Sequence, residues 1–309
     1  MNRDVTVRDV GPRDGLQLVE AVLPTATKLA WIAADAAAGI PEIEVCSFVP
    51  ARVIAQFADA VAVGAGAIPD LVACALVPNR RGAEIGFATG IAKLNYVLSV
   101  SESHNRQNVR RSRAESLQGL RDIIALRDAR FPGVAIGVGL ATALGCTLEG
   151  VVPEAETLRW LEIVLETGAD EVMLPDTVGY AHPAQVKSLF AKAAGICGDT
   201  PLWSHFHDTR GLGLANASAA LEAGCTRFDA SLAGLGGCPF APGATGNIVL
   251  EDLVFLLEAE GLRTGIDIEA LRAPRAIVEA ALADEPKYGH VLIAGLPKGF
   301  TQPSSIAAE

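Results

Sequence analysis

The chain has 309 residues, of which 50% are hydrophobic and only 5% aromatic, and its formal net charge is −11. This composition supplies a large aliphatic core and excludes intrinsic disorder, which requires low hydrophobicity. The acidic balance argues against a nucleic-acid partner, which would be met by clustered lysines and arginines.

Targeting and redox features indicate a cytoplasmic protein with no membrane partner. The first residues carry neither the apolar region of a signal peptide nor an Arg-rich transit segment. No apolar stretch is long and uninterrupted enough to span a bilayer. Six cysteines, at positions 46, 74, 146, 197, 225 and 238, are scattered without a CxxC pair. That scatter favours reduced thiols over a disulfide framework.

Eight short runs rich in β-branched residues predict strands. They cover Val5–Val10, Ile43–Cys46, Leu71–Leu76, Lys93–Ser99, Val134–Leu140, Glu171–Leu174, Leu202–Phe206 and Arg227–Ala230. Longer segments rich in Ala, Leu, Glu and Arg predict helices over Thr25–Ala38, Glu115–Arg130, Glu154–Thr167, Pro183–Ala194, Leu214–Ala223, Val249–Glu260 and Ile268–Ala283. Gly39, Gly168 and Gly224 follow three of these segments, as is typical of helix C-caps.

The alternation of these elements predicts a single (β/α)8 TIM barrel of the α/β class. Strands that are almost wholly apolar are typical of a parallel sheet covered on both faces. Eight alternations over about 230 residues fit a closed barrel, whereas a doubly wound sheet would be unusually large. The pattern is least regular between about residues 43 and 95. We expect the barrel to span residues 1–262, with a C-terminal helical extension over 263–309 in the same domain.

Polar residues gather where the predicted strands end, which is where barrel enzymes carry their chemistry. Placed in this way are Arg13 and Asp14 after the first strand, Glu44 in the second, Asp176 after the sixth, His205 and His207 at the seventh, and Cys238 and Asn247 after the eighth. His205 and His207 are two residues apart on a strand, so both imidazoles can face one site. With Asp and amide oxygens they form a mixed nitrogen and oxygen ligand set that suits Mg²⁺ or Mn²⁺, with Zn²⁺ or Co²⁺ as alternatives. A pair of hydrogen-bonded rim histidines would show the same spacing.

The loop over residues 234–246 is rich in glycine and contains Cys238. Glycines let a backbone approach a ligand or act as hinges of a lid, and a cysteine there can serve as a general acid. A flexible connection with an incidental thiol is the plain alternative. A phosphate-binding loop is less well matched, because GxxxxGK[ST] and the strand–GxGxxG–helix context are both missing.

Five motifs occur in the order found in hydroxymethylglutaryl-CoA lyases, and the chain resembles that family from about residue 5 to 262. They are VGPRDGLQ (10–17), EVCSFV (44–49), DTVG (176–179), HFHDT (205–209) and GGCPFA (236–241). The cysteine loop is the most specific of these, because it separates the lyases from related isopropylmalate and homocitrate synthases. The resemblance implies a metal-dependent carbon–carbon lyase that cleaves a 3-hydroxyacyl-CoA thioester to acetyl-CoA and a keto product. It also implies a homodimer.

The resemblance assigns a role to each motif residue. The implied metal ligands are Asp14, His205, His207 and Asn247. The implied catalytic residues are Arg13 for the enolate oxygen, Cys238 in the mobile loop, His205 as a possible proton acceptor, and Glu44 and Asp176 for orientation or proton transfer. The implied substrate-binding positions are Gln17, Ser47, Gly139, Ala141 and Arg210.

Departures from the family pattern concern the pocket wall. Gly139 and Ala141 stand where the family's fifth strand has Tyr and Ser, Met173 stands where Ser is common, and Arg210 replaces a Tyr. The acyl group can therefore be hydroxymethylglutaryl, citramalyl, methylmalyl or a longer 3-hydroxy-3-alkylglutaryl. Arg210 either contacts a substrate carboxylate or is solvated. Two other functions stay open: an acyl-CoA condensing synthase of the same superfamily, and a non-catalytic barrel that binds metal or CoA.

Overall fold

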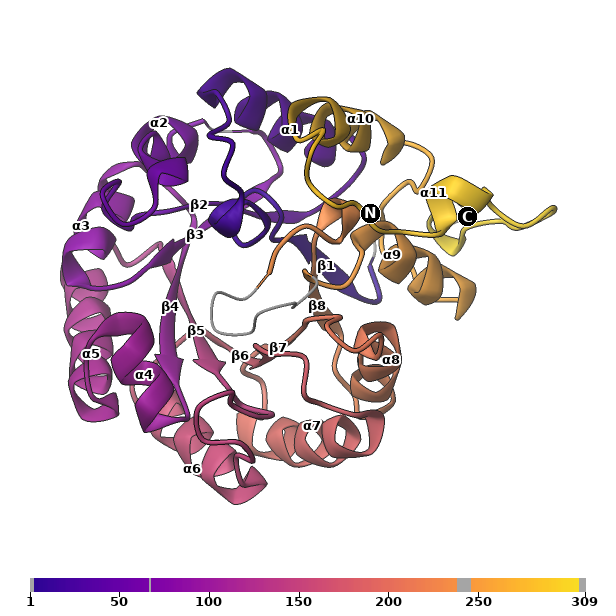
Figure 1. Ribbon diagram of the computed structural model, residues 1–309. Helices are drawn as coiled ribbons and strands as arrows, with labels where there is room; N and C mark the ends of the chain where they lie inside the picture. The colour runs from indigo at the N-terminus through magenta and orange to yellow at the C-terminus, as the bar shows by residue number, and fades with distance from the viewer. Residues whose placement is uncertain (1–2, 67, 238–245, 306–309) are drawn as a thin grey trace.

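The eight strands close into a parallel barrel surrounded by helices, which confirms the predicted TIM barrel (Figure 1). The computed structural model describes residues 3–66, 68–237 and 246–305. The strands are β1 (Thr6–Asp9), β2 (Glu42–Ser47), β3 (Val72–Val77), β4 (Lys93–Ser99), β5 (Ala135–Ala141), β6 (Glu171–Asp176), β7 (Leu202–Phe206) and β8 (Arg227–Ala230). Each pairs with its neighbour in sequence, and β1 pairs with β8. Every predicted strand overlaps an observed one, because buried parallel strands are apolar runs that stand out in the sequence.

The helices cover the outside of the barrel. They are α1 (Thr25–Ala37), α2 (Ala60–Gly64), α3 (Arg80–Ala88), α4 (Glu102–Val109), α5 (Arg113–Arg130), α6 (Glu154–Leu165), α7 (Pro183–Cys197), α8 (Gly213–Glu222), α9 (Leu250–Ala259), α10 (Arg272–Ala281) and α11 (Val291–Ala294). Gly39, Gly168 and Gly224 have φ values of +95°, +86° and +92°, so these glycines do end helices as predicted.

Helices α2, α3, α4 and α11 were not predicted, and their sequences explain why. Helices α2 and α11 have only five and four residues. The buried side of α4 is polar, with His104 and Asn105. The buried side of α3 includes Gly82 and Gly86, and glycine lowers helix propensity. A Cβ at Gly86 would lie 2.7 Å from Leu94 Cδ2, so the glycine lets α3 approach the barrel without displacing the Leu94 side chain.

The chain after the barrel packs back onto it. Helix α10 lies against α1 (Figure 1), and the Asp267 N–H donates to the Ala38 carbonyl. Arg263 is hydrogen-bonded to Asp4, which precedes β1. In the described part of the chain, no helix has the length and apolar character needed to cross a membrane. The five cysteines within it are buried and free. The domain boundary at residue 262 stays a prediction.

Charged side chains fill the interior of the barrel near the amino ends of its strands. Arg8 of β1 is fully buried, and its Nε donates to Asp229 Oδ1 of β8 at 2.8 Å. Its Nη1 donates to Glu42 Oε1 of β2 at 2.9 Å and to Glu171 Oε1 of β6 at 3.3 Å. Lys93 of β4 donates to the same two glutamates, at 2.7 Å in each case. These ion pairs therefore tie together five strands that are far apart in the sequence.

This network is stable because each charge has partners. Burial opposes the charge on Arg8, but the carboxylates of Asp229, Glu42 and Glu171 outweigh it and raise the Arg8 pKa above its ordinary value. The guanidinium also lies 4.0 Å from the ring centroid of Trp203, where a cation–π contact is favourable. Removing one partner of a buried ion pair leaves the other uncompensated.

We predict that Arg8→Met lowers the free energy of unfolding by about 3–5 kcal/mol, because the buried carboxylates lose a shared positive charge. Urea denaturation of the two proteins measures the difference. The matched control is Arg263→Met, which breaks a surface pair with Asp4 and should change the free energy of unfolding little. An equally small loss for Arg8→Met would contradict the structural role of the network.

Candidate active site

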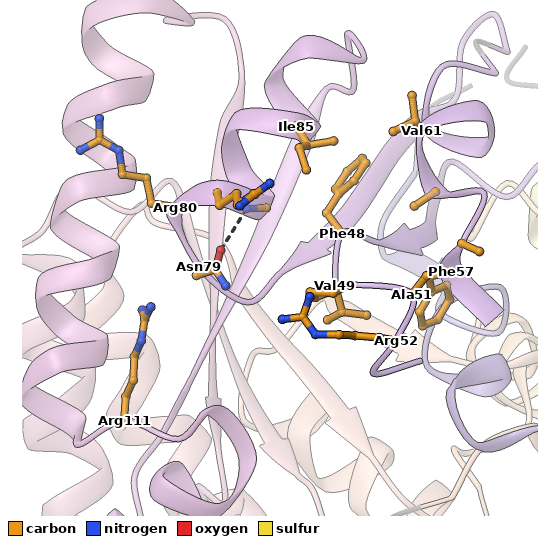
Figure 2. A pocket seen from close by; sticks show the side chains of 15 residues that line it. Phe48, Val49, Ala51, Arg52, Phe57, Val61, Asn79, Arg80, Ile85 and Arg111 are labelled. Atoms are coloured by element: carbon orange, nitrogen blue, oxygen red, sulfur yellow. Dashed lines mark hydrogen bonds between the residues drawn. The ribbon is translucent and has the colours of Figure 1, made fainter. Parts of the chain in front are cut away.

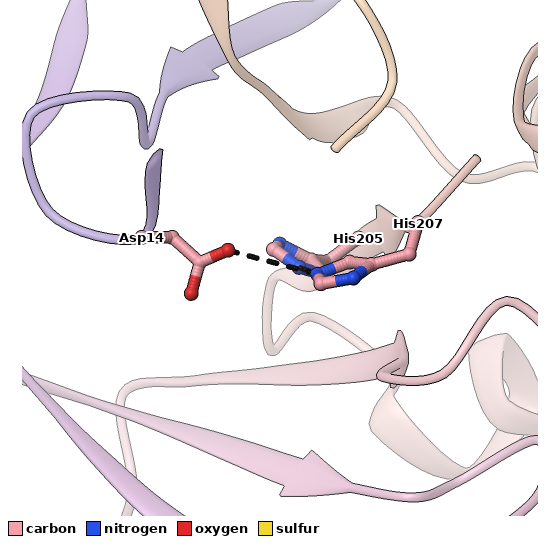
Figure 3. A group of neighbouring side chains, drawn as sticks. All are labelled: Asp14, His205 and His207. Atoms are coloured by element: carbon pink, nitrogen blue, oxygen red, sulfur yellow. Dashed lines mark hydrogen bonds and ion pairs between the residues drawn. The ribbon is translucent and has the colours of Figure 1, made fainter. Parts of the chain in front are cut away.

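Asp14, His205 and His207 meet at the carboxyl end of the barrel (Figure 3). Asp14 follows β1, His205 lies on β7, and His207 comes directly after β7. The two histidine Nε2 atoms are 3.1 Å apart, and His207 Nε2 lies 3.6 Å from Asp14 Oδ2. Both imidazoles are buried, with exposed fractions of 6% and 5%. The i, i+2 spacing on a strand therefore places both rings on one side, as the sequence predicted.

Asn247, the residue that directly follows the glycine-rich loop, also contacts this group. Its backbone forms a bridge with His207, and its Nδ2 donates to Asp14 Oδ2 at 2.9 Å and to the Leu235 carbonyl at 3.0 Å. Its Oδ1 is buried and has no hydrogen-bond partner among the described residues. An unpaired buried acceptor is costly, which makes this oxygen available to a ligand.

The tautomer of His205 is fixed by a carboxylate that the sequence analysis did not name. Asp229 Oδ2 lies 3.1 Å from His205 Nδ1. Burial would favour the neutral acid, but Arg8 and His205 outweigh it and lower the Asp229 pKa. An ionised carboxylate draws the imidazole proton to Nδ1 and leaves the Nε2 lone pair facing His207.

These four groups fit a bound cation. Ligand atoms of Asp14, His205 and His207 lie within 4.8 Å of one another, and the amide group of Asn247 contacts Asp14. A cation held by Asp14, His205 and His207 would replace the contact between the two Nε2 atoms. Burial opposes ionisation of Asp14, yet Arg13 and the two histidines outweigh it and hold the Asp14 pKa far below its usual range. Asp14 is therefore an anion at neutral pH and can act as a ligand.

Arg13 is held between two carboxylates beside this group. Its Nε donates to Glu44 Oε2 at 2.5 Å and its Nη1 to Asp14 Oδ1 at 2.6 Å. Asn95 of β4 donates to the other oxygen of Glu44 at 2.9 Å. Burial lowers the Arg13 pKa, but Glu44 and Asp14 outweigh it and raise the pKa above its ordinary value. The guanidinium is thus permanently charged and fixed in orientation.

A cavity of about 150 Å³ connects these residues with the opposite side of the barrel mouth. The predicted site residues that line it are Arg13, Asp14, Gln17, Glu44, Gly139, Ala141, His205 and His207. Sequence reasoning missed Asn95, His104, Asn108 and Thr177, which also line it. Asn95 could have been found, because it is a polar residue in the interior of a predicted strand, and the same is true of Asp229.

Other predicted residues lie outside this cavity. The Asp176 carboxylate accepts the N–H groups of Tyr180 and Ala181 at 2.9 and 3.0 Å, which anchors the loop after β6. Burial raises the Asp176 pKa, and these N–H groups oppose the rise. Arg210 donates to the Gly179 carbonyl at 2.8 Å and covers the Tyr180 ring. Catalytic and substrate-binding roles for Asp176 and Arg210 stay predictions.

Ser47 and Cys238 are the remaining predicted site residues. Ser47 is fully buried in β2, and its Oγ has no partner among the described residues. Cys238 lies outside the described residues, although Gly237 just before it reaches the cavity. The role of Cys238 as a general acid therefore stays a prediction, as does a substrate contact of Ser47.

A second cavity, of about 620 Å³, lies at the ends of β2 and β3 and is separate from this chemistry (Figure 2). Phe48, Phe57 and Ile85 form apolar walls, while Arg52 and Arg111 add positive charge. None of the described residues that could hold a cation lines it. Size alone therefore does not identify the active site, and the smaller cavity is the one that contains the reactive groups.

We predict that Asp229→Asn weakens Mn²⁺ binding by about 10- to 100-fold, because residues that orient a metal-bound histidine contribute to affinity by this amount. Titration of Mn²⁺ followed by electron paramagnetic resonance measures the affinity, and a thermal melt checks the fold. The control is Asp252→Asn on α9, which alters a different Asp–His pair, since Asp252 Oδ2 lies 3.0 Å from His290 Nδ1. Unchanged Mn²⁺ affinity in a folded Asp229→Asn variant would refute the role of Asp229.

Comparison with known proteins places this arrangement in a family. The family model described as HMGL-like matches residues 4–278. The chain is 38% identical to hydroxymethylglutaryl-CoA lyase of Bacillus subtilis over 279 residues, covering 90% of this chain and 93% of that protein. It is 41% identical to (R)-citramalyl-CoA lyase of Chloroflexus aurantiacus over 290 residues, covering 90% and 91%.

A solved structure agrees with these relatives. The HMG-CoA lyase of Acinetobacter baumannii, described in complex with coenzyme A and 3-methylmalate, superposes with a TM-score of 0.90 at 37% identity. The match covers 97% of this chain and 99% of that one. With its closed barrel and its Asp14–His205–His207 group, this chain belongs to the HMGL-like family.

Proposed function

We propose that this protein is a divalent-metal-dependent carbon–carbon lyase that cleaves a 3-hydroxyacyl-CoA to acetyl-CoA and a keto product. One observation carries the proposal: a fixed arginine and a cation-binding group line the same cavity. The relatives named as lyases of hydroxymethylglutaryl-CoA and citramalyl-CoA, and the coenzyme A complex of the Acinetobacter baumannii enzyme, support a CoA thioester as substrate.

Asp14, His205, His207 and Asn247 would hold the metal. When bound, the metal supplies a Lewis acid that orients the substrate and lowers the pKa of its hydroxyl. Mixed nitrogen and oxygen ligands suit Mg²⁺ or Mn²⁺, with Zn²⁺ or Co²⁺ as alternatives. Formation of a homodimer and a cytoplasmic location are further parts of the proposal.

The reaction breaks the bond between C2 and C3 of the acyl group. The C3 hydroxyl loses its proton, its C–O bond becomes C=O, and the C2–C3 electron pair passes into the thioester as an enolate. Protonation at C2 then gives acetyl-CoA. The chain must therefore accept one proton, stabilise one oxyanion and deliver one proton.

Arg13 is placed to stabilise the enolate oxygen. Its bonds to Glu44 and Asp14 fix the plane of the guanidinium, and Asn95 in turn holds Glu44. A donor that is already oriented needs no reorganisation when charge develops, and one such donor is typically worth about 3–4 kcal/mol. The low exposure of the Arg13 side chain, 12%, strengthens the interaction by excluding water.

Proton transfer is assigned to two groups. His205 is a candidate acceptor for the hydroxyl proton when its Nε2 is not bound to the metal, because Asp229 would then stabilise the imidazolium that forms. Cys238 would deliver the proton to C2 from the glycine-rich loop, because the preceding residue, Gly237, lines the cavity. Glu44 positions Arg13, and Asp176 positions the loop after β6.

The test is an assay of acetyl-CoA release from hydroxymethylglutaryl-CoA, citramalyl-CoA and related 3-hydroxyacyl-CoA thioesters with Mg²⁺ or Mn²⁺. We expect turnover of at least one thioester, its loss with a chelator and its recovery with added metal. Release of free CoA from acetyl-CoA plus pyruvate or 2-oxoisovalerate, without lyase activity, would instead indicate a synthase. Metal binding without turnover of any thioester would indicate a non-catalytic barrel.

We predict that Arg13→Gln lowers kcat by about 10²- to 10³-fold, because a preorganised donor to the enolate oxygen is lost. Steady-state kinetics on the cleaved thioester measures this change, while Mn²⁺ titration should show that metal is still bound. Arg80→Gln is the control, since Arg80 is exposed, is paired with Glu84 and lies outside the 150 Å³ cavity. A near-normal kcat in Arg13→Gln would rule out its role at the enolate.

A further inference from the structure

The two sides of the 150 Å³ cavity differ in character. The side formed by β1, β2 and β7 carries the ionic groups Arg13, Asp14, Glu44, His205 and His207. In the order of the barrel strands, β3 to β6 lie across from them, and their contribution is mainly apolar. The apolar residues of that side include Leu76, Val97, Gly139, Ala141, Met173 and Pro175.

Three residues of the apolar side form one row across neighbouring strands. The strand register pairs Val97 of β4 with Gly139 of β5, and Gly139 with Met173 of β6. All three line the cavity, so the glycine lies between two larger side chains in a single layer. A missing side chain between two apolar neighbours leaves a recess in the wall.

The surroundings of Gly139 show that this recess is open. A Cβ added there would lie 3.6 Å from Val97 Cγ2 and 4.0 Å from the Tyr96 carbonyl oxygen, which is ordinary contact. Two residues earlier on the same strand, a Cβ at Gly137 would lie 2.5 Å from Asn95 Oδ1 and 2.9 Å from Glu171 Oε1. The space at Gly137 is thus filled by polar side chains, whereas the space at Gly139 is available to a ligand.

The recess is suited to an uncharged group. Arg13 is the one Lys or Arg among the described residues lining the cavity, and two carboxylates already bind it. The undescribed loop segment 238–245 contains no Lys or Arg in its sequence. His104 also lines the cavity, and burial lowers its pKa, which keeps it neutral. A substrate carboxylate would therefore be placed on the ionic side and not in the recess.

We propose that Gly139 determines the acyl specificity of the enzyme. The recess between Val97 and Met173 takes an alkyl substituent of two or more carbons on C3. The substrate class is then a carboxylate-bearing 3-hydroxyacyl-CoA with a C3 alkyl group larger than methyl, and the keto product retains that group. This inference rests on the proposed lyase function, and it assigns Gly139 to recognition and not to the chemical steps.

The test compares thioesters that differ only in a methyl, ethyl or propyl group on C3, with the wild type, Gly139→Ala and Gly139→Val. One methylene in an apolar pocket is worth about 10- to 200-fold in kcat/KM. We expect the wild type to favour ethyl or propyl over methyl by about tenfold or more. Gly139→Val should remove that preference, as measured by the ratio of kcat/KM between the ethyl or propyl compound and the methyl compound, and Gly139→Ala should lower the ratio partway.

The control is Gly133→Val, at a glycine of the α5–β5 loop whose Cβ would meet no atom within 4 Å. It should leave the preference unchanged. The proposal would be overturned if the wild type had an equal or higher kcat/KM for the methyl compound than for the ethyl and propyl compounds, and if Gly139→Val did not alter that ratio. If the valine variant does not fold, the same result with Gly139→Ala would overturn it.

A binding measurement separates this proposal from the lyase function. Calorimetry with Mn²⁺ compares the affinities for 3-oxobutanoate and 3-oxohexanoate, which stand for short and long keto products. Tighter binding of the longer acid by the wild type, lost in Gly139→Val, supports the recess even if no thioester is cleaved. Cleavage without any chain-length preference in either measurement keeps the lyase and refutes the recess.

Discussion

Asp229 accepts a hydrogen bond from Arg8 on one oxygen and contacts His205 on the other. One carboxylate therefore connects the ion pairs of Arg8 inside the barrel to the active site. Its neighbours keep it ionised in a fully buried position. If Arg8 were neutral, Asp229 would tend to take up a proton, and the tautomer of His205 would no longer be fixed. The orientation of the site thus depends on ion pairs formed deep in the barrel.

The C-terminal extension supports the site from the outside. Ala233, the residue just before the glycine-rich loop, has a φ of +60°. This left-handed conformation costs a non-glycine residue about 1–2 kcal/mol. Its N–H donates to the Glu251 carboxylate, with the nearer oxygen at 3.1 Å. Arg275 of α10 donates to the same carboxylate at 2.8 Å. Burial raises the Glu251 pKa to about 7 despite this partner. Helix α10 therefore helps to hold Ala233, which begins the segment that leads to Cys238.

Chemistry and recognition occupy different sides of the barrel mouth. The ionic side combines the cation-binding group with Arg13, and each of its charges is compensated by a neighbour. The apolar side has few polar partners to satisfy, so residues there can change size without leaving a buried charge unpaired. Two relatives are named as lyases of hydroxymethylglutaryl-CoA and of citramalyl-CoA, which differ in the acyl group.

The amino-acid sequence by itself determined the strands, most helices and the motif residues that reach the cavity, because burial and caps leave periodic local patterns. It did not reveal Asp229 or Asn95 as partners of His205 and Glu44, since these pairs are 24 and 51 residues apart in the chain. Nor did it show that Arg210 binds the loop after β6. Only barrel closure and strand register decided which side chains meet, because contacts between distant residues depend on how whole strands align and not on their local composition.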